Sequence, residues 1–205
     1  MCLTSMPDSG FFVITGVGEA IMATLMAPFV RDVLHADALA YGAISAAQAI
    51  GGLAGGAVVA LLGHRISPWP AVAWGAFTFG LLDLMLFLYP LFTPLLWPAF
   101  ALMVLVGLPG ALMAASGMTI IQTAAGPEHR GRVFGTFLAF EAIAMPAGTL
   151  AAGTLGELGI VPVIAAQGAG YCLAGLVLAV AGHKIKNTAG VRREPSFTPA
   201  VTRHS

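Results

Sequence analysis

Charged side chains are scarce in this sequence. Only 9% of its 205 residues are Asp, Glu, Lys or Arg, and 58% are hydrophobic, whereas an ordinary soluble domain carries roughly 25% charged residues. So few charges cannot cover a water-facing surface. Disorder is also excluded, because a disordered chain needs low hydrophobicity. The remaining solvent is lipid, so the bilayer is the first expected partner.

Alternating polarity is missing as well. In lipid the backbone must satisfy its own hydrogen bonds, which only helices and closed barrels achieve. Barrel strands would read as segments of about ten residues with alternating polarity. The apolar blocks here are about twice that length, close to what a membrane-spanning helix needs. The sequence therefore predicts an all-α integral membrane fold.

The motifs of common enzyme classes are absent. The sequence contains no H-E-x-x-H, no paired cysteine motif, no G-x-S-x-G and no P-loop lysine. Its five histidines are scattered over predicted loops and the polar tail, which predicts no metal site. The formal net charge of zero gives no reason to expect nucleic acid. We therefore expect neither an enzyme nor a cofactor.

Charges, prolines and glycines divide the chain into six predicted spans. A helix needs about 20 residues to cross about 30 Å of hydrocarbon. Pro90, Pro94 and Pro98 separate the third span from the fourth, and a count of five spans stays open there. The spans run from Phe11 to Val30, Tyr41 to Leu62, Ala71 to Tyr89, Pro98 to Thr123, Val133 to Leu155 and Ile160 to Ala181.

Short polar segments flank the spans. We expect a leader at residues 1–10, a six-helix transmembrane domain at 11–182 and a flexible tail at 183–205. The leader carries no Lys or Arg, so the basic region of a signal peptide is missing. With a cytoplasmic N-terminus, eight of the nine Lys and Arg residues lie inside and only Arg31 outside. A multi-pass protein of the cell membrane with both termini cytoplasmic is the expectation.

Three acidic residues lie inside predicted spans: Glu19, Asp83 and Glu141. A charge at the bilayer centre costs about 2.5 to 3.5 kcal/mol on insertion scales, and no Lys or Arg lies within a span to pair with them. A desolvated carboxyl without a cationic partner favours its neutral form. This suits a residue that binds and releases protons. The alternative is a neutral acid hydrogen-bonded to a neighbouring helix, or one that reaches the interface.

Amide side chains offer weaker candidates. Gln48 lies in the second span, and Gln122 and Gln167 lie in or near the ends of later ones. Any of them could hydrogen-bond to a substrate in a cavity, so Gln48 joins the acids as a pathway candidate. Hydrogen bonds between helices explain all three equally simply.

Prolines and glycines inside spans predict bends and close packing. Pro109 with Gly110, and Pro146 with Gly148, interrupt two spans and are candidate hinges. Static kinks would explain them as well.

The second span contains two overlapping G-x-x-x-G pairs, formed by Gly51, Gly52, Gly55 and Gly56. Such a face lets another helix backbone come close. Ordinary helix packing is the simple interpretation, and a sliding contact between moving helices is the alternative.

One loop resembles a known family. The sequence P-E-H-R-G-R-V-F-G from Pro127 to Gly135, after I-I-Q-T from Ile120 to Thr123, resembles the cytoplasmic loop between helices ten and eleven of bacterial major facilitator superfamily efflux carriers. The similar subgroup contains drug, macrolide and siderophore exporters. The stretches Ala147 to Gly156 and Gly159 to Ala181 resemble the last two helices of these carriers, and Tyr41 to Arg65 resembles helix eight.

The resemblance covers one half of such a carrier, helices seven to twelve, because a complete carrier contains two six-helix halves. It implies that Glu19 and Glu141 face the transport pathway and that Asp83 is structural.

The same resemblance implies a cytoplasmic gate that contains Arg65, Glu128, Arg130 and Arg132. Further basic residues usually follow the position of Arg65 in the family, whereas Ile66 and its neighbours follow it here, which weakens this assignment.

Two functions follow from these expectations. The first is a transporter module, half of a proton-coupled exporter that moves a small amphipathic substrate by alternating access. Such a half needs a homodimeric partner or a separate N-terminal half to complete its pathway. The second is a truncated or split membrane protein that transports nothing and acts only as a structural partner.

Overall fold

Long helices account for almost all of the residues that the structure describes. The computed structural model describes residues 8–124 and 130–191. Within these ranges there is no strand, which confirms the all-α prediction. The long helices are α1 (Asp8–Pro28), α2 (Ala38–Leu62), α3 (Pro68–Leu88), α4 (Trp97–Ala124), α5 (Arg130–Leu155) and α6 (Ile160–Val191). Short helical turns follow four of them: η2 (Phe29–Val33), η3 (Gly63–Arg65), η4 (Tyr89–Leu91) and η5 (Gly156–Leu158).

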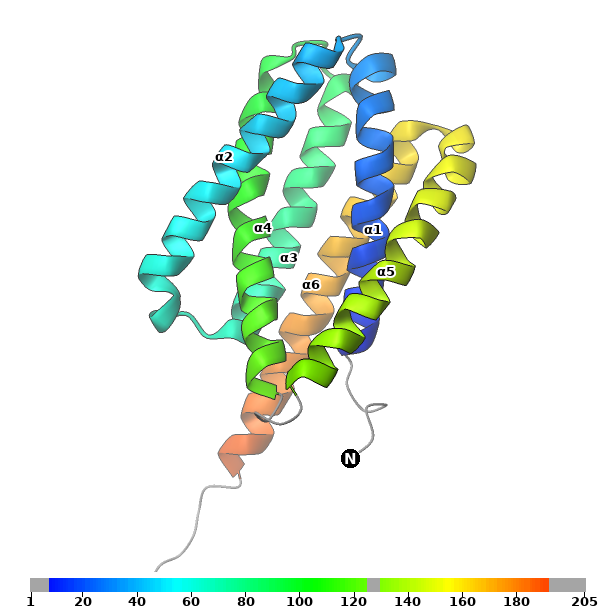
Figure 1. Ribbon diagram of the computed structural model, residues 1–205. Helices are drawn as coiled ribbons and strands as arrows, with labels where there is room; N and C mark the ends of the chain where they lie inside the picture. Colours follow the sequence, from blue (N-terminus) through cyan, green and yellow to red (C-terminus); the bar gives the residue numbers. More distant parts are fainter. Residues whose placement is uncertain (1–7, 125–129, 192–205) are drawn as a thin grey trace, which may run out of the picture.

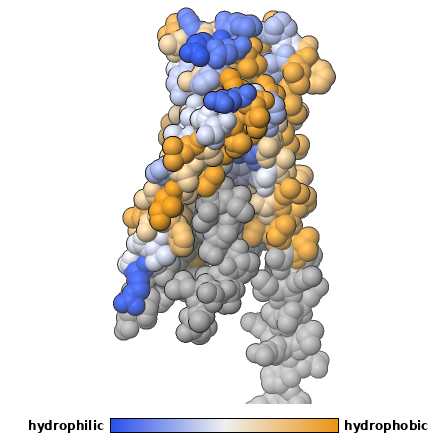
Figure 2. Space-filling view, turned by 90° about the vertical axis from the view of Figure 1, so that its right-hand side faces the viewer, coloured by the Kyte–Doolittle hydropathy of each residue, from blue (hydrophilic) through white to orange (hydrophobic). Residues whose placement is uncertain are grey.

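The helices match the dimensions of a bilayer. In the described part of the chain, α2 to α6 each contain a segment long and apolar enough to cross a membrane. The remaining long helix, α1, has 21 residues, which at 1.5 Å per residue span about 30 Å. Figure 2 shows hydrophilic residues gathered at the upper end of the molecule, with mostly apolar residues along its side.

The first helix begins earlier and the last helix ends later than the sequence predicts. Helix α1 begins at Asp8, so the expected leader is already helical before residue 11. Helix α6 continues to Val191, past the predicted end of the last span. Lys184 and Lys186 are good helix formers, and no proline follows until Pro195. The polar residues after Ala181 end the apolar span, but the helix continues through them.

The helices form an open arc. Helix α2 packs on α4, α4 on α3, α3 on α6, α6 on α1, and α1 on α5. Figure 1 shows α2 and α5 at opposite edges of the bundle, with α3 and α6 between them. The two end helices are also the least buried, with 22% of the apolar segment buried in α2 and 11% in α5, against 56% in α3. Both ends of the arc therefore present faces that the described residues do not cover.

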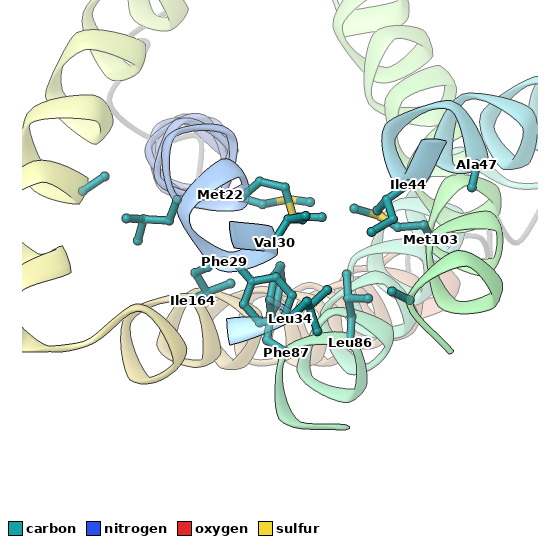
Figure 3. Packing of buried hydrophobic residues seen from close by; sticks show 14 residues of the cluster. Met22, Phe29, Val30, Leu34, Ile44, Ala47, Leu86, Phe87, Met103 and Ile164 are labelled. Atoms are coloured by element: carbon teal, nitrogen blue, oxygen red, sulfur yellow. The ribbon is translucent and has the colours of Figure 1, made fainter. Parts of the chain in front are cut away.

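Loops alternate between the two ends of the bundle. The turns η2, η4 and η5 lie together at one end, while η3, the start of α1 and the end of α6 lie toward the other (Figure 1). Near the first end, aromatic and aliphatic side chains form the largest apolar core. The rings of Phe29 and Phe87 meet edge to face at 4.9 Å, and Ile44, Met103 and Ile164 contribute from three further helices (Figure 3).

Glycines allow the closest helix contacts. A methyl group added at Gly55 would lie 2.8 Å from the Leu108 carbonyl oxygen, and one added at Gly51 would collide with Val104. The overlapping glycines Gly52 and Gly56 have nothing within 4 Å of such a methyl group. Of the two G-x-x-x-G pairs, one packs against α4 and the other remains uncovered.

Candidate functional site

A polar cluster lies where α1, α3 and α6 meet. Asp83 on α3 has no exposed surface, and Gln167 on α6 is only 9% exposed. Tyr171, one turn after Gln167, is buried as well. Residues four apart lie on the same face of a helix, so Gln167 and Tyr171 form one polar stripe on the apolar, membrane-spanning part of α6.

Glu19 joins this cluster from α1. Its carboxyl group and the Tyr171 hydroxyl share a hydrogen bond. Glu19 is itself exposed, and it begins a stripe along α1 that continues with Ala23 and Ala27. We call these three residues the exposed stripe. Glu19 is therefore an exposed residue whose carboxyl group hydrogen-bonds to the buried Tyr171.

Asp83 interacts electrostatically with Glu19 and Tyr171. Both of its carboxyl oxygens are buried without a hydrogen-bond partner among the described residues, as are both amide atoms of Gln167. A buried polar atom without a partner costs about 1 to 3 kcal/mol. Four such atoms at one helix junction are the strongest sign of a functional site in this fold.

Small residues bring the three helices together at this point. A methyl group added at Gly18 would lie 3.1 Å from Cγ of Gln167, and one added at Gly80 would lie 2.5 Å from the Gly168 carbonyl oxygen. The ring of Tyr171 packs against Phe79 at 5.1 Å. These contacts hold Tyr171 between Glu19 on one side and α3 on the other.

The other pathway candidates lie apart from this cluster. Glu141 is exposed on α5 and has no hydrogen bond or ion pair with any described residue. Gln48 is half-buried on α2, where its backbone oxygen approaches Gly107 of α4. The cluster joins Glu19 with Asp83, the acid that the family resemblance set aside as structural.

The gate candidates are only partly described. Arg65 is exposed in η3 and donates a hydrogen bond of 3.2 Å to Nε2 of the adjacent His64. Arg132 is exposed on the first turn of α5. Glu128 lies outside the described residues, and Arg130 begins α5 with a side chain that is also outside them. A gate formed by these four residues stays a prediction.

The hinge candidates lie within continuous helices. Helix α4 continues through Pro109 and α5 through Pro146. Gly110 faces the ring of Phe79, and a methyl group added at Gly148 would lie 2.6 Å from Cβ of Ala20 on α1. Both glycines thus have a packing role, and bending at these positions stays a prediction.

Sequence reasoning missed Tyr171. The Sγ atom of its neighbour Cys172 lies 3.6 Å from the Phe77 carbonyl oxygen. The available signal was the spacing of four residues between Gln167 and Tyr171 in a block that is otherwise apolar.

Outside the spans, one ion pair marks the end of the bundle that holds η2. The Arg31 guanidinium donates two hydrogen bonds to Asp32, at 2.7 and 3.0 Å. This hydrogen bonding lowers the pKa of Asp32 below its ordinary value and raises that of Arg31. Both side chains are exposed, so the pair contributes little to stability.

An apolar groove of about 580 Å³ runs along α1 and α6 beside the cluster. Its walls include Ile21, Leu158 and Val163, and Gln167 and Tyr171 lie at its inner side. The described residues form no group of three His, Cys, Asp or Glu side chains that could hold a metal ion.

Comparison with known proteins identifies the family. The family model of the Major Facilitator Superfamily matches residues 9–202. The chain belongs to the Major Facilitator Superfamily. It is therefore a multi-pass membrane protein from a family of carriers rather than an enzyme.

A similar curated protein is the class C tetracycline resistance protein of Escherichia coli. It is 29% identical over 153 residues, which cover 74% of this major facilitator chain and 37% of the relative. The chain thus matches well under half of the relative's length. No solved structure matches it.

Proposed function

We propose that this major facilitator chain is the C-terminal six-helix half of a proton-coupled exporter for a small amphipathic molecule. The two halves of such carriers are parallel repeats about an axis along the membrane normal. The open arc supports this proposal, because α2 and α5 expose the faces that a second half would cover. A homodimeric partner or a separate N-terminal half would supply that cover.

The cluster of Glu19, Tyr171 and Asp83 is the observation that carries the proposal. The Glu19 carboxyl group on the exposed stripe hydrogen-bonds to Tyr171 and interacts electrostatically with the buried carboxyl group of Asp83. No Lys or Arg lies in the spans to fix either acid in its charged form. Glu19 is therefore the residue that we expect to take up and release the coupling proton, with Glu141 and Gln48 on the substrate pathway.

The distribution of cations supports an orientation. Turn η3, which contains Arg65, and the start of α5 lie at the same end of the bundle as the start of α1 and the end of α6 (Figure 1). Since basic residues are retained on the inner side of a membrane, we place this end in the cytoplasm and the protein in the cell membrane. Arg65, Glu128, Arg130 and Arg132 would then form the cytoplasmic gate.

Transport in proteoliposomes tests this function. The chain is reconstituted alone and together with a separately expressed six-helix N-terminal half of a related carrier, and a pH gradient is imposed. Tetracycline is the first probe, because the relative is named for resistance to it. Flux that depends on the gradient and falls at least tenfold in Glu19→Gln supports the proposal.

Glu157→Gln is the matched control, because Glu157 is an exposed acid in η5 outside the cluster. Equal flux in wild type and Glu19→Gln would exclude Glu19 as the coupling site. Absence of flux for every probe and every pairing would favour the structural, non-transporting role instead.

A further inference from the structure

We propose that Tyr171 is a proton-relay residue that passes protons between Asp83 and Glu19 through one bridging water molecule. The starting point is a contrast in exposure. Asp83 has no exposed surface, whereas Glu19 is open on the exposed stripe. A proton on Asp83 therefore needs a polar route through the helix junction to reach solvent.

Tyr171 lies on that route. Its hydroxyl group hydrogen-bonds to Glu19 and interacts electrostatically with Asp83. Its ring is held by Phe79, and its Cβ lies beside Gly80, which precedes Asp83 by one turn. With the ring fixed from two sides, the hydroxyl oxygen has little freedom to leave the space between the carboxyl groups.

A water molecule completes the connection. The oxygens of Asp83 and the amide of Gln167 are fully buried and have no partner among the described residues. Buried water typically makes about three hydrogen bonds to such groups. A water molecule bonded to Asp83, Gln167 and Tyr171 would give the Asp83 and Gln167 side chains one hydrogen-bond partner each and would connect Asp83 to the tyrosine hydroxyl group.

The transfer balances without another reactant. The carboxyl proton of Asp83 moves to the water, the water gives a proton to the Tyr171 oxygen, and the tyrosine hydroxyl proton moves to the Glu19 carboxylate. Asp83 ends as a carboxylate and Glu19 as a neutral acid, while the water and Tyr171 return to their neutral forms. The reverse sequence returns the proton to Asp83.

Few other titratable groups face this junction. Helix α6 contributes Cys172 besides Tyr171, and α1 contributes Glu19. Helix α4, which also packs on α3, contains no titratable side chain. The relay deepens the proton-coupled function proposed above and rests on it for its purpose, but its test does not require transport.

Infrared spectroscopy of the full chain in lipid measures the relay directly. The carbonyl band of the protonated Asp83 is assigned by its loss in Asp83→Asn, and its shift after transfer into D₂O reports proton exchange. We expect Tyr171→Phe to slow this exchange about 100-fold or more, the low end of what a positioned proton-transfer group provides. Gln167→Leu, which removes the amide partner of the water, should slow it as well.

Tyr89→Phe is the matched control, because the Tyr89 hydroxyl is also buried without a described partner but lies at the end of α3. In this variant the Asp83 carboxyl proton should exchange as fast as in wild type. Exchange in Tyr171→Phe as fast as in wild type, or no Asp83 carboxyl band at any pH at which the protein is folded, would overturn the relay. Slow exchange in Tyr171→Phe together with absent flux would keep the relay and remove the transport function.

Discussion

The two overlapping glycine pairs of α2 allow a matched packing experiment. Gly51 and Gly55 face the backbone of α4, whereas Gly52 and Gly56 face open space. Replacing each pair by alanine adds the same two methyl groups to the middle of the same helix. Because the gain in helix propensity is equal for both pairs, about 1 kcal/mol per glycine, it cancels when the two variants are compared. The difference in stability then reports packing alone.

The structure gives the expected size of that difference. A methyl group at Gly55 would lie 2.8 Å from the Leu108 carbonyl oxygen, and one at Gly51 would collide with Val104. These neighbours are backbone atoms, which cannot rotate away, so α2 and α4 would have to separate. Overpacking typically costs about 1 to 3 kcal/mol per site. The Gly51→Ala, Gly55→Ala variant should therefore be about 2 to 6 kcal/mol less stable than the Gly52→Ala, Gly56→Ala variant.

Unfolding in detergent micelles, followed by loss of helical circular dichroism during titration with denaturant, measures the difference. The Gly52 and Gly56 variant should unfold at or above the wild-type midpoint. Equal midpoints for the two variants, or a lower midpoint for the variant with the open pair, would refute the assigned α2 to α4 packing. If the Gly52→Ala, Gly56→Ala variant unfolds like wild type but associates more weakly with a second chain, Gly52 and Gly56 form a contact with that partner.

Three further outcomes follow from the structure. Asp83→Leu should leave the fold at least as stable as wild type, because it removes a buried group whose lack of a partner costs about 1 to 3 kcal/mol; a lower unfolding midpoint would contradict this. Arg31 keeps the pKa of Asp32 low, so Asp32 stays ionised to lower pH than an ordinary aspartate. Arg31→Gln should raise that pKa toward its usual value, which an NMR titration of the Asp32 carboxyl measures. Cysteines placed at His35 and Ser67 should react with an impermeant maleimide from opposite sides of the membrane, since η2 and η3 lie at opposite ends of the bundle. Labelling of both cysteines from the same side would contradict this arrangement.

The long helices were predictable because the solvent dictates them. Few charges and long apolar blocks leave helices as the only solution in lipid. The structure has a helix wherever the sequence predicts a span, including the division at Pro90 to Pro98, where η4 ends the α3 segment and α4 begins at Trp97. The ends of the helices were harder to predict, because a polar residue such as Lys184 can lie outside the membrane and still belong to the helix.

Helix orientation could not be predicted in the same way. In an amphipathic helix the polar face reveals which side is buried, but α3 is apolar on all sides except at a few positions. The sequence therefore predicts that Asp83 lies inside a membrane span but not the direction of its side chain. It also gave no sign that a residue of α3 meets one of α1, because α6 mediates that contact through Tyr171.

The same limit applies to the glycines, and it explains how the cluster forms. The pattern on α2 predicted a close approach without saying which pair makes it. At the cluster, Gly18 and Gly80 permit the approach of α6 to its two neighbours, and only that approach places a tyrosine between two acids. Polar residues at one depth become a connected site when the residues around them are small. In a bilayer, where apolar side chains gain little by leaving the lipid, such glycines determine the contacts that the acids can make.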